Sequence, residues 1–541
     1  MKKLFKVLLV SALCVYIIAS CSAERTREDK VAAIIGKVDS PFFVMSMTPQ
    51  NLMDKSGIMD GVLPFTYEMV LSFFIDEAVT GIDYSVKTQI VVGKGKSFQP
   101  SFYGIFKVKD EVKFKELIEK EANASIVEKD GMKTAIKEKD GYAVVWNEEF
   151  AIISNIPIDF TAMFNGGGSG QGDATVTKLI ELIKAGDDGE VNTTYADFLK
   201  KDADISMYYD GKGFYGFMKD MMGEDAEEIE KMKDTYEGLS SEIYLNFGNG
   251  TIDFEFSNTL SDMLKEKMNF LNQKGVEGKL LSYSNSANPI LVGGYSLDFT
   301  KFFEYFESQM EETAYERMEE DITEMGLTID EVKNSLSGEF VYMIDHVSTY
   351  EEVVDYGYGE PFSYTRRTPM FAIAVGVGNV APIQALLVDS LKQPNGSYKM
   401  GDAYLVLDGD VLFATNDSVW SSKVIAKSTV TITKGKDVLA KDPFTIFVDF
   451  TSLASMDGMK DAEAYINLFK EFSGGANLEG GHFTFTLNDS SKNSLRLLAE
   501  VVSAELTRLE QLGNENLEKE MEDAILDGLD ELDEDLEEVE L

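Results

Sequence analysis

The same series of strand and helix patterns occurs twice along this chain, and this repetition constrains the fold more than any other feature. Each half has an apolar segment after a proline, two strands that lead into helices, a two-strand turn unit and an alternating strand before a long helix. The matched segments are 41–48 and 289–298, 102–121 and 371–392, 142–155 and 404–416, 203–210 and 443–450, and 250–271 and 481–509. The sequence therefore predicts an internal duplication. A coincidental order of common elements is the alternative.

Alternating polarity indicates the class of fold. Residues 252–256 read Ile-Asp-Phe-Glu-Phe and residues 483–487 read Phe-Thr-Phe-Thr-Leu, which is the two-residue period of a strand. This pattern is typical of an antiparallel sheet with one face in water, and we expect helices over the other face. We predict an α+β fold that is internally duplicated, with antiparallel sheets flanked by helices.

The expected domain boundaries follow from this repetition. We place the first α+β repeat at residues 33–277 and the second at 278–512. The glycine-rich segment 165–172 indicates a subdomain break near 165–200 in the first repeat, and we expect the corresponding break near 426–441 in the second. A chain of 541 residues also exceeds the size that one hydrophobic core usually serves, which agrees with this division.

Residues 513–541 are predicted to form an acidic C-terminal helix or tail. Between Glu515 and Glu540 there are 14 acidic residues and one lysine. Apolar residues recur there at helical spacing: Leu517, Met521, Ile525, Leu529, Leu532, Leu536 and Val539. The pattern favours a solvated helix that rests an apolar stripe on the body of the protein, and a partner-binding tail is the alternative.

The N-terminus has the form of a signal peptide over residues 1–20. A basic start is followed by an apolar run over 7–19, which is too short to span the ~30 Å core of a bilayer. The following Ile-Ala-Ser-Cys resembles the lipobox of bacterial lipoproteins, which implies that Cys21 is acylated and becomes the first residue. Residues 21–32 would then be a tether. An ordinary cleaved signal with an unmodified cysteine is the alternative.

Composition excludes several classes of function. The formal net charge of −44 repels nucleic-acid phosphates and anionic head groups, so we expect no nucleic-acid partner and a membrane partner only through the lipid anchor. Cys14 and Cys21 are the two cysteines, so the mature chain has no disulfide. His346 and His482 are the two histidines and lie far apart, which makes a zinc site improbable. We predict no cofactor and no metal.

The sequence contains no complete catalytic motif, and we predict no catalytic residue. Asp345, His346 and Ser348 supply the residue types of a nucleophilic triad, but their spacing on one extended segment predicts that they point to alternate faces. Residues 91–97 are similar to the end of a phosphate-binding loop but lack its first glycine, because position 90 is isoleucine. Carboxylates are abundant, so a hydrolase that uses a carboxylate pair stays an alternative.

Aromatic residues give weak candidates for ligand binding. Four tyrosines lie in the long insertion 348–368, namely Tyr350, Tyr356, Tyr358 and Tyr364. They could present a surface to a glycan, or they could form cross-strand pairs that stiffen a hairpin. Trp146 and Trp420 lie within or beside expected strands, where packing in the core is the default.

Several segments resemble a family of Bacteroidota envelope lipoproteins known as a domain of unknown function. They are the lipobox, residues 42–57, residues 80–83 (Thr-Gly-Ile-Asp), residues 336–342 and the strand from Phe371. The resemblance implies an envelope lipoprotein without an assigned activity, and it provides no catalytic residues.

These observations lead to a hypothesis for function. We expect a non-enzymatic envelope lipoprotein that binds or scaffolds another envelope component, either a protein or a glycan. A carbohydrate-binding accessory lipoprotein and a carboxylate-based hydrolase of envelope polymers are the alternatives. By resemblance to the enterobacterial sorting rule, Ser22 after the cysteine favours the outer membrane. The sequence does not predict on which side of that membrane the protein lies.

Overall fold

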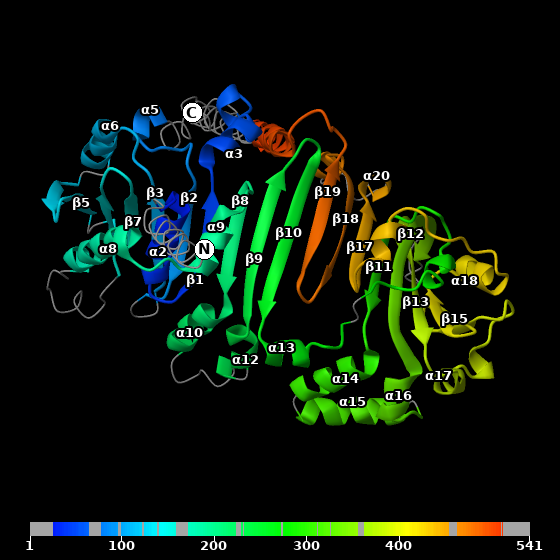
Figure 1. Ribbon diagram of the computed structural model, residues 1–541. Helices are drawn as coiled ribbons and strands as arrows, with labels where there is room; N and C mark the ends of the chain where they lie inside the picture. The colour runs from blue at the N-terminus through cyan, green and yellow to red at the C-terminus, as the bar shows by residue number, and fades with distance from the viewer. Residues whose placement is uncertain are drawn as a thin grey trace, which may run out of the picture. The chain divides into compact units, whose positions relative to one another are not determined.

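The structure is a computed structural model that forms two compact units, which we describe separately. The first unit comprises Met1–Pro49 and Ile75–Glu242, and the second comprises Gln50–Phe74 and Ile243–Leu541. The described residues are 25–63, 77–95, 99–121, 124–137, 140–157, 171–222, 229–230, 232–271, 274–310, 312–324, 326–354, 362–453, 463–509 and 511. The predicted α+β class with antiparallel sheets is confirmed (Figure 1).

The first unit contains an eight-stranded antiparallel sheet. Its strands are β1 Pro41–Met47, β2 Thr88–Gly93, β3 Ser101–Phe106, β4 Ile126–Lys129, β5 Met132–Lys137, β6 Tyr142–Trp146, β7 Ala151–Asn155 and β8 Ile205–Asp210. They pair in the order β4-β5-β6-β7-β3-β2-β1-β8. Short hairpins therefore build one edge, while the strands nearest the other edge come from distant parts of the chain.

Helices pack on both faces of this sheet. They are α2 Arg27–Lys37, α5 Glu77–Thr80, α6 Glu111–Glu116 with a π-turn at Leu117–Glu121, α8 Gln171–Asp188, α9 Thr193–Lys200, α10 Gly211–Met222 and α12 Lys233–Glu237. Helix α2 begins where the Thr26 side chain accepts from the Asp29 N–H, and it buries residues 31–35. Trp146 is 1% exposed and packs edge-on against Phe114, so its predicted core position is confirmed.

The second unit contains an antiparallel sheet of eleven strands. They are β9 Leu239–Phe247, whose first four residues belong to the first unit, β10 Thr251–Leu260, β11 Leu291–Ser296, β12 Leu336–Val354, β13 Phe362–Val377, β14 Tyr398–Met400, β15 Ala403–Asp408, β16 Val411–Thr415, β17 Phe444–Asp449, β18 Phe469–Asn477 and β19 Gly480–Leu487. Their order is β9-β10-β19-β18-β17-β11-β12-β13-β16-β15-β14. The two-strand turn unit predicted over 404–416 is confirmed: β15 and β16 pair across a turn at Asp408 and Gly409, with Gly409 at φ +61°.

The second unit also contains helices. They are α3 Pro49–Ser56, α13 Asp262–Lys267, α14 Phe299–Gln309, α15 Glu312–Glu324, α16 Ile329–Ser335, α17 Val380–Leu386, α18 Ser418–Ile425, α19 Lys436–Leu439, α20 Phe450–Leu453, α21 Glu463–Ile466 and a helix over 494–509. The core contains Phe413 and Trp420, both 0% exposed, so the predicted core position of this second tryptophan is also confirmed. Residues 426–441, where we expected a subdomain break, contribute Ile432 and Leu439 to this core.

The two halves of the chain share one order of strand pairing. In the first half it is β5-β6-β7-β3-β2-β1-β8, and in the second it is β14-β15-β16-β13-β12-β11-β17, with every pair antiparallel. Helices also follow equivalent strands, such as α6 after β3 and α17 after β13. An internal duplication predicts this correspondence, because a copied segment keeps its topology.

The long insertion forms a hairpin, as one of our two readings predicted. Strands β12 and β13 pair along their length, from Leu336 with Val377 to Val354 with Phe362.

No helix among the described residues is long and apolar enough to cross a membrane. The signal peptide, Cys21 and the acidic segment 513–541 lie outside the described residues.

Candidate binding face

Strand β13 of the second unit is apolar on both faces, but the two faces differ in exposure. Along β13, Ala372 and Ala374 are 0% exposed and belong to the core. Their neighbours in the strand point to the other face, where Phe371 is 43% exposed and Ile373 is 39% exposed. An antiparallel strand with one wet face normally carries polar residues on that face. Within the described part of the chain, this sheet therefore leaves apolar surface uncovered.

The strand registers align this surface into three rows that cross β10, β19, β18, β17, β11, β12 and β13. The rows are Ile252, Phe485, Phe472, Val448, Leu291, Ile344 and Phe371; Phe254, Phe483, Gly474, Ile446, Gly293, Tyr342 and Ile373; and Phe256, Gly481, Ala476, Phe444, Tyr295, Phe340 and Val375. We call these residues the aromatic face. None of them carries a charge. Tyr295, Phe371 and Ile373 are exposed, Ile252, Gly293 and Val448 are buried, and the others are half-buried.

Aromatic rings lie over glycines on this face. A Cβ atom at position 293 would clash with the Tyr342 ring, and one at position 474 would clash with the Phe483 ring. The missing side chains therefore allow the rings to lie against the backbone. Neighbouring rings contact one another, with the Phe472 and Phe485 centroids 4.4 Å apart. The result is a surface made largely of ring faces.

The opposite side of β10, β18 and β19 is polar. His482 Nε2 lies 3.4 Å from Asp253 Oδ1, and the Thr484 hydroxyl donates to the same oxygen at 2.8 Å. The predicted alternation is thus present on these strands. We had expected helices over its apolar side, but the structure leaves rings such as Phe254 half-exposed there. A two-residue period shows that one face is apolar without showing what covers it.

The first unit has an equivalent apolar face. Phe43 pairs with Val92 and Tyr209, and Met45 pairs with Ile90 and Met207. Phe43 and Met45 are half-buried, whereas their neighbours Phe42 and Val44 are buried on the other face. Strand β1 corresponds to β11 in the shared order of strand pairing, so half-buried apolar residues lie on corresponding strands in the two halves of the chain.

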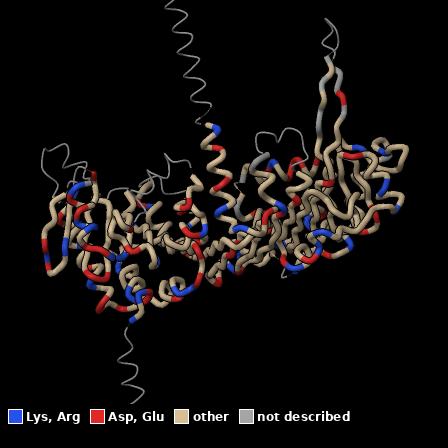
Figure 2. Tube along the Cα trace, turned by 90° about the horizontal axis from the view of Figure 1, so that it is seen from above, with Lys and Arg blue, Asp and Glu red and all other residues tan. Residues whose placement is uncertain are grey.

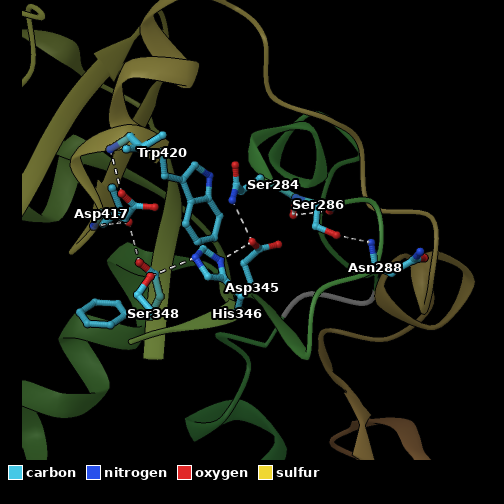
Figure 3. A network of polar contacts seen from close by, with 12 residues as sticks. Ser284, Ser286, Asn288, Asp345, His346, Ser348, Asp417 and Trp420 are labelled. Atoms are coloured by element: carbon cyan, nitrogen blue, oxygen red, sulfur yellow. Dashed lines mark hydrogen bonds and ion pairs between the residues drawn. The ribbon is translucent and has the colours of Figure 1, made fainter. Parts of the chain in front are cut away.

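A polar relay lies on the helix-covered side of β12, and it corrects one prediction. His346 Nδ1 lies 2.8 Å from Asp345 Oδ2, and Ser348 Oγ lies 3.2 Å from His346 Nε2 (Figure 3). The prediction that these side chains point to alternate faces is wrong. Ile344 pairs with Phe371 but His346 pairs with Met370, so Asp345 is an extra residue in a β-bulge. The bulge redirects the side chains that follow it.

The surroundings of the relay orient its imidazole. The Asp345 side chain is 4% exposed, and the Asn285 amide donates to its Oδ2 at 2.8 Å. The Lys423 ammonium donates in turn to the side-chain oxygen Oδ1 of Asn285. A carboxylate accepts hydrogen bonds, so it places the imidazole proton on Nδ1 and leaves Nε2 to accept from Ser348. The relay thus holds a serine hydroxyl against a basic nitrogen.

Other candidate residues are less informative. Tyr350 and Tyr364 lie in the paired strands β12 and β13, while Tyr356 and Tyr358 lie outside the described residues. Within the described ranges, no cluster of three or more His, Cys, Asp or Glu side chains could hold a metal. On the aromatic face, burial raises the pKa of Tyr342, so its hydroxyl is neutral at physiological pH.

Comparisons with known proteins do not assign this chain to a family. No protein-family model and no curated protein matches this chain. Among solved structures, crystal form III of TP0453 is similar to 45% of this chain over 89% of its own length, with 12% identity and a TM-score of 0.25. Crystal form IV of TP0453 is similar to 45% of this chain over 87% of its own length, with 12% identity and a TM-score of 0.26. Scores this low carry no argument about fold or function.

Proposed function

We propose that this protein is a non-enzymatic lipoprotein of the bacterial cell envelope that binds another envelope component through the aromatic face of its second unit. The observation that carries the proposal is the uncovered, uncharged surface across seven strands. Contiguous apolar patches larger than about 300–600 Å² are rare on soluble proteins and mark interaction sites. An exposed surface of this kind is costly in water, so its presence is best explained by a ligand.

The anchor is the second part of the proposal. The lipobox and the resemblance to Bacteroidota lipoproteins support acylation at Cys21, and Ser22 supports an outer-membrane location. We expect Cys21→Ser to release the protein from membranes and to abolish its labelling by a palmitate analogue. Cys14→Ser is the matched control, because it lies within the predicted signal peptide. A Cys21→Ser protein that still labels would contradict the anchor.

Binding can be tested by crosslinked pull-down from membranes. We expect the captured component to be lost with Ile373→Glu, which places a charge on the aromatic face. The matched control is Thr484→Glu, which places the same charge on the polar side of the same sheet. If both variants capture the component as the wild type does, the aromatic face is not the binding site.

The relay favours a second candidate function, a serine-dependent hydrolase. In that reaction Ser348 Oγ would attack an ester carbonyl while its proton passes to His346 Nε2, and the leaving alcohol would take that proton; water would then release the acid. We would expect a fluorophosphonate probe to label Ser348, and His346→Gln to abolish labelling. The aromatic face would have no direct part in this chemistry. An unlabelled wild-type protein would exclude this candidate.

A further inference from the structure

The chemistry of the aromatic face restricts what can bind there. Among its residues, the polar side-chain atoms are the hydroxyls of Tyr295 and Tyr342, and the backbone groups of these central strands are paired in the sheet. A sugar or an extended peptide would bring hydroxyl or amide groups that lose water without gaining partners, which costs free energy. A hydrocarbon chain brings none.

The dimensions of the face suit a chain that lies flat. Seven strands at a spacing of ~4.8 Å span roughly 29 Å across the sheet. One leaflet of a bilayer contributes about half of its ~30 Å hydrocarbon core, so a single acyl chain is about 15 Å long there. The face can therefore hold an acyl chain along its full length. The rings lie against Gly293 and Gly474, which keeps the surface flat, and its three rows lie about 7 Å apart along the strands, which leaves room for chains side by side.

Charge selects among apolar occupants. The chain carries a formal net charge of −44, and acidic residues occur throughout the described chain (Figure 2). A second copy of this chain would bring the same charge and be repelled, and so would a lipid with an anionic head group. A neutral or zwitterionic lipid meets no such repulsion.

We infer that the aromatic face binds the acyl chains of a lipid without net negative charge. This inference rests on the proposed function and names the class of its ligand. The lipid is held by its chains against the rings of β10, β11, β12 and β19, and its head group stays in water. The hydrophobic effect supplies the binding free energy.

The test uses the full mature protein and phosphatidylcholine with a diazirine in its acyl chain, supplied in vesicles of unlabelled phosphatidylcholine. We expect photolysis to attach lipid to residues of the aromatic face, as mapped by mass spectrometry. Ile373→Glu should reduce this labelling about tenfold, which corresponds to about 1.4 kcal/mol. Thr484→Glu, on the polar side, should leave it unchanged. Excess dioleoylglycerol should compete, and maltoheptaose should not.

Two other results separate this inference from the proposed function. If the face takes no lipid label but membrane pull-down still depends on Ile373, the face binds a protein partner and the lipid inference is wrong. If neither the label nor the pull-down depends on Ile373, the proposed function fails as well. Equal labelling of wild type and Ile373→Glu also overturns the inference, because it would place the lipid elsewhere.

Discussion

Adjacent substitutions on β13 test whether the aromatic face is uncovered. Ala374 is 0% exposed and pairs with Val341 and Phe413 in the core, whereas Ile373 is 39% exposed on the other face. The same residue, glutamate, can be placed at either position. We expect Ala374→Glu to prevent folding of the second unit and Ile373→Glu to leave it folded.

The magnitudes follow from burial. A carboxylate forced into the core without a partner costs several kcal/mol, comparable with the total stability of ~5–15 kcal/mol of a typical domain. Complete burial of an isoleucine side chain contributes about 1.5–3 kcal/mol. Ile373 is 39% exposed, so part of this contribution is already absent. We therefore expect Ile373→Glu to lower the free energy of unfolding by only about 1–2 kcal/mol.

Tryptophan fluorescence can follow the second unit alone. The chain has two tryptophans, and Trp146→Phe leaves Trp420 as the single reporter in the core of the second unit. Urea unfolding in this background should give a cooperative transition for Ile373→Glu and none for Ala374→Glu. If Ile373→Glu were as damaging as Ala374→Glu, the aromatic face would be covered and our reasoning would be refuted.

Three further predictions concern stability. Trp420→Phe should cost about 2–4 kcal/mol by calorimetry or urea unfolding, because it shrinks a buried ring and removes the 2.8 Å hydrogen bond from Nε1 to the Tyr283 carbonyl. Burial raises the pKa of Glu339, with the charge of a nearby glutamate adding to it, so the ionised carboxylate destabilises the fold at neutral pH. Glu339→Gln should therefore stabilise the protein at pH 7, and the gain should vanish below about pH 4. The hydrogen bond from Lys333, 2.7 Å from the Glu307 carboxylate, lowers the pKa of Glu307. Lys333→Met should cost about 0.5–1 kcal/mol at pH 7, and this cost should fade as the pH falls through the lowered pKa of Glu307.

Each of these has a contrary result. A Trp420→Phe protein as stable as the wild type would show that the indole is not packed as described. A benefit of Glu339→Gln that persists at pH 3 would mean that its cause is not the buried charge. A cost of Lys333→Met that is equal at pH 3 and pH 7 would assign it to lost packing of the lysine stem.

The sequence was sufficient for the class of fold but not for the arrangement of its strands. Alternation along residues 252–256 and 483–487 predicted antiparallel strands, and the turn at Gly409 was readable from its residue types. The pairing of β10 with β19, which are more than 200 residues apart, was not readable. A period-two pattern specifies which residues of a strand share a face. The strands with which it pairs depend on packing across the whole sheet.

The two features of the candidate site were missed for different reasons. The aromatic face could not be predicted, because the alternation of polar and apolar residues does not show whether helices cover the apolar side. The relay was hidden because it depends on one extra residue, Asp345, in the pairing of β12 with β13. A bulge is a property of two strands together, so the sequence of one strand could not indicate it. The sequence signal that could have indicated the aromatic face is the presence of apolar residues on both faces of β13.

Thiol accessibility tests the central claim most directly, because Cys14 and Cys21 are the natural cysteines and both belong to the predicted signal and anchor. Single cysteines can be introduced as Ile373→Cys on the aromatic face and Thr484→Cys on the polar side. In the purified, lipid-free protein, both should react with a maleimide. In intact membranes, Ile373→Cys should be protected while Thr484→Cys still reacts. Equal reactivity of the two variants in membranes would contradict a bound component on the aromatic face.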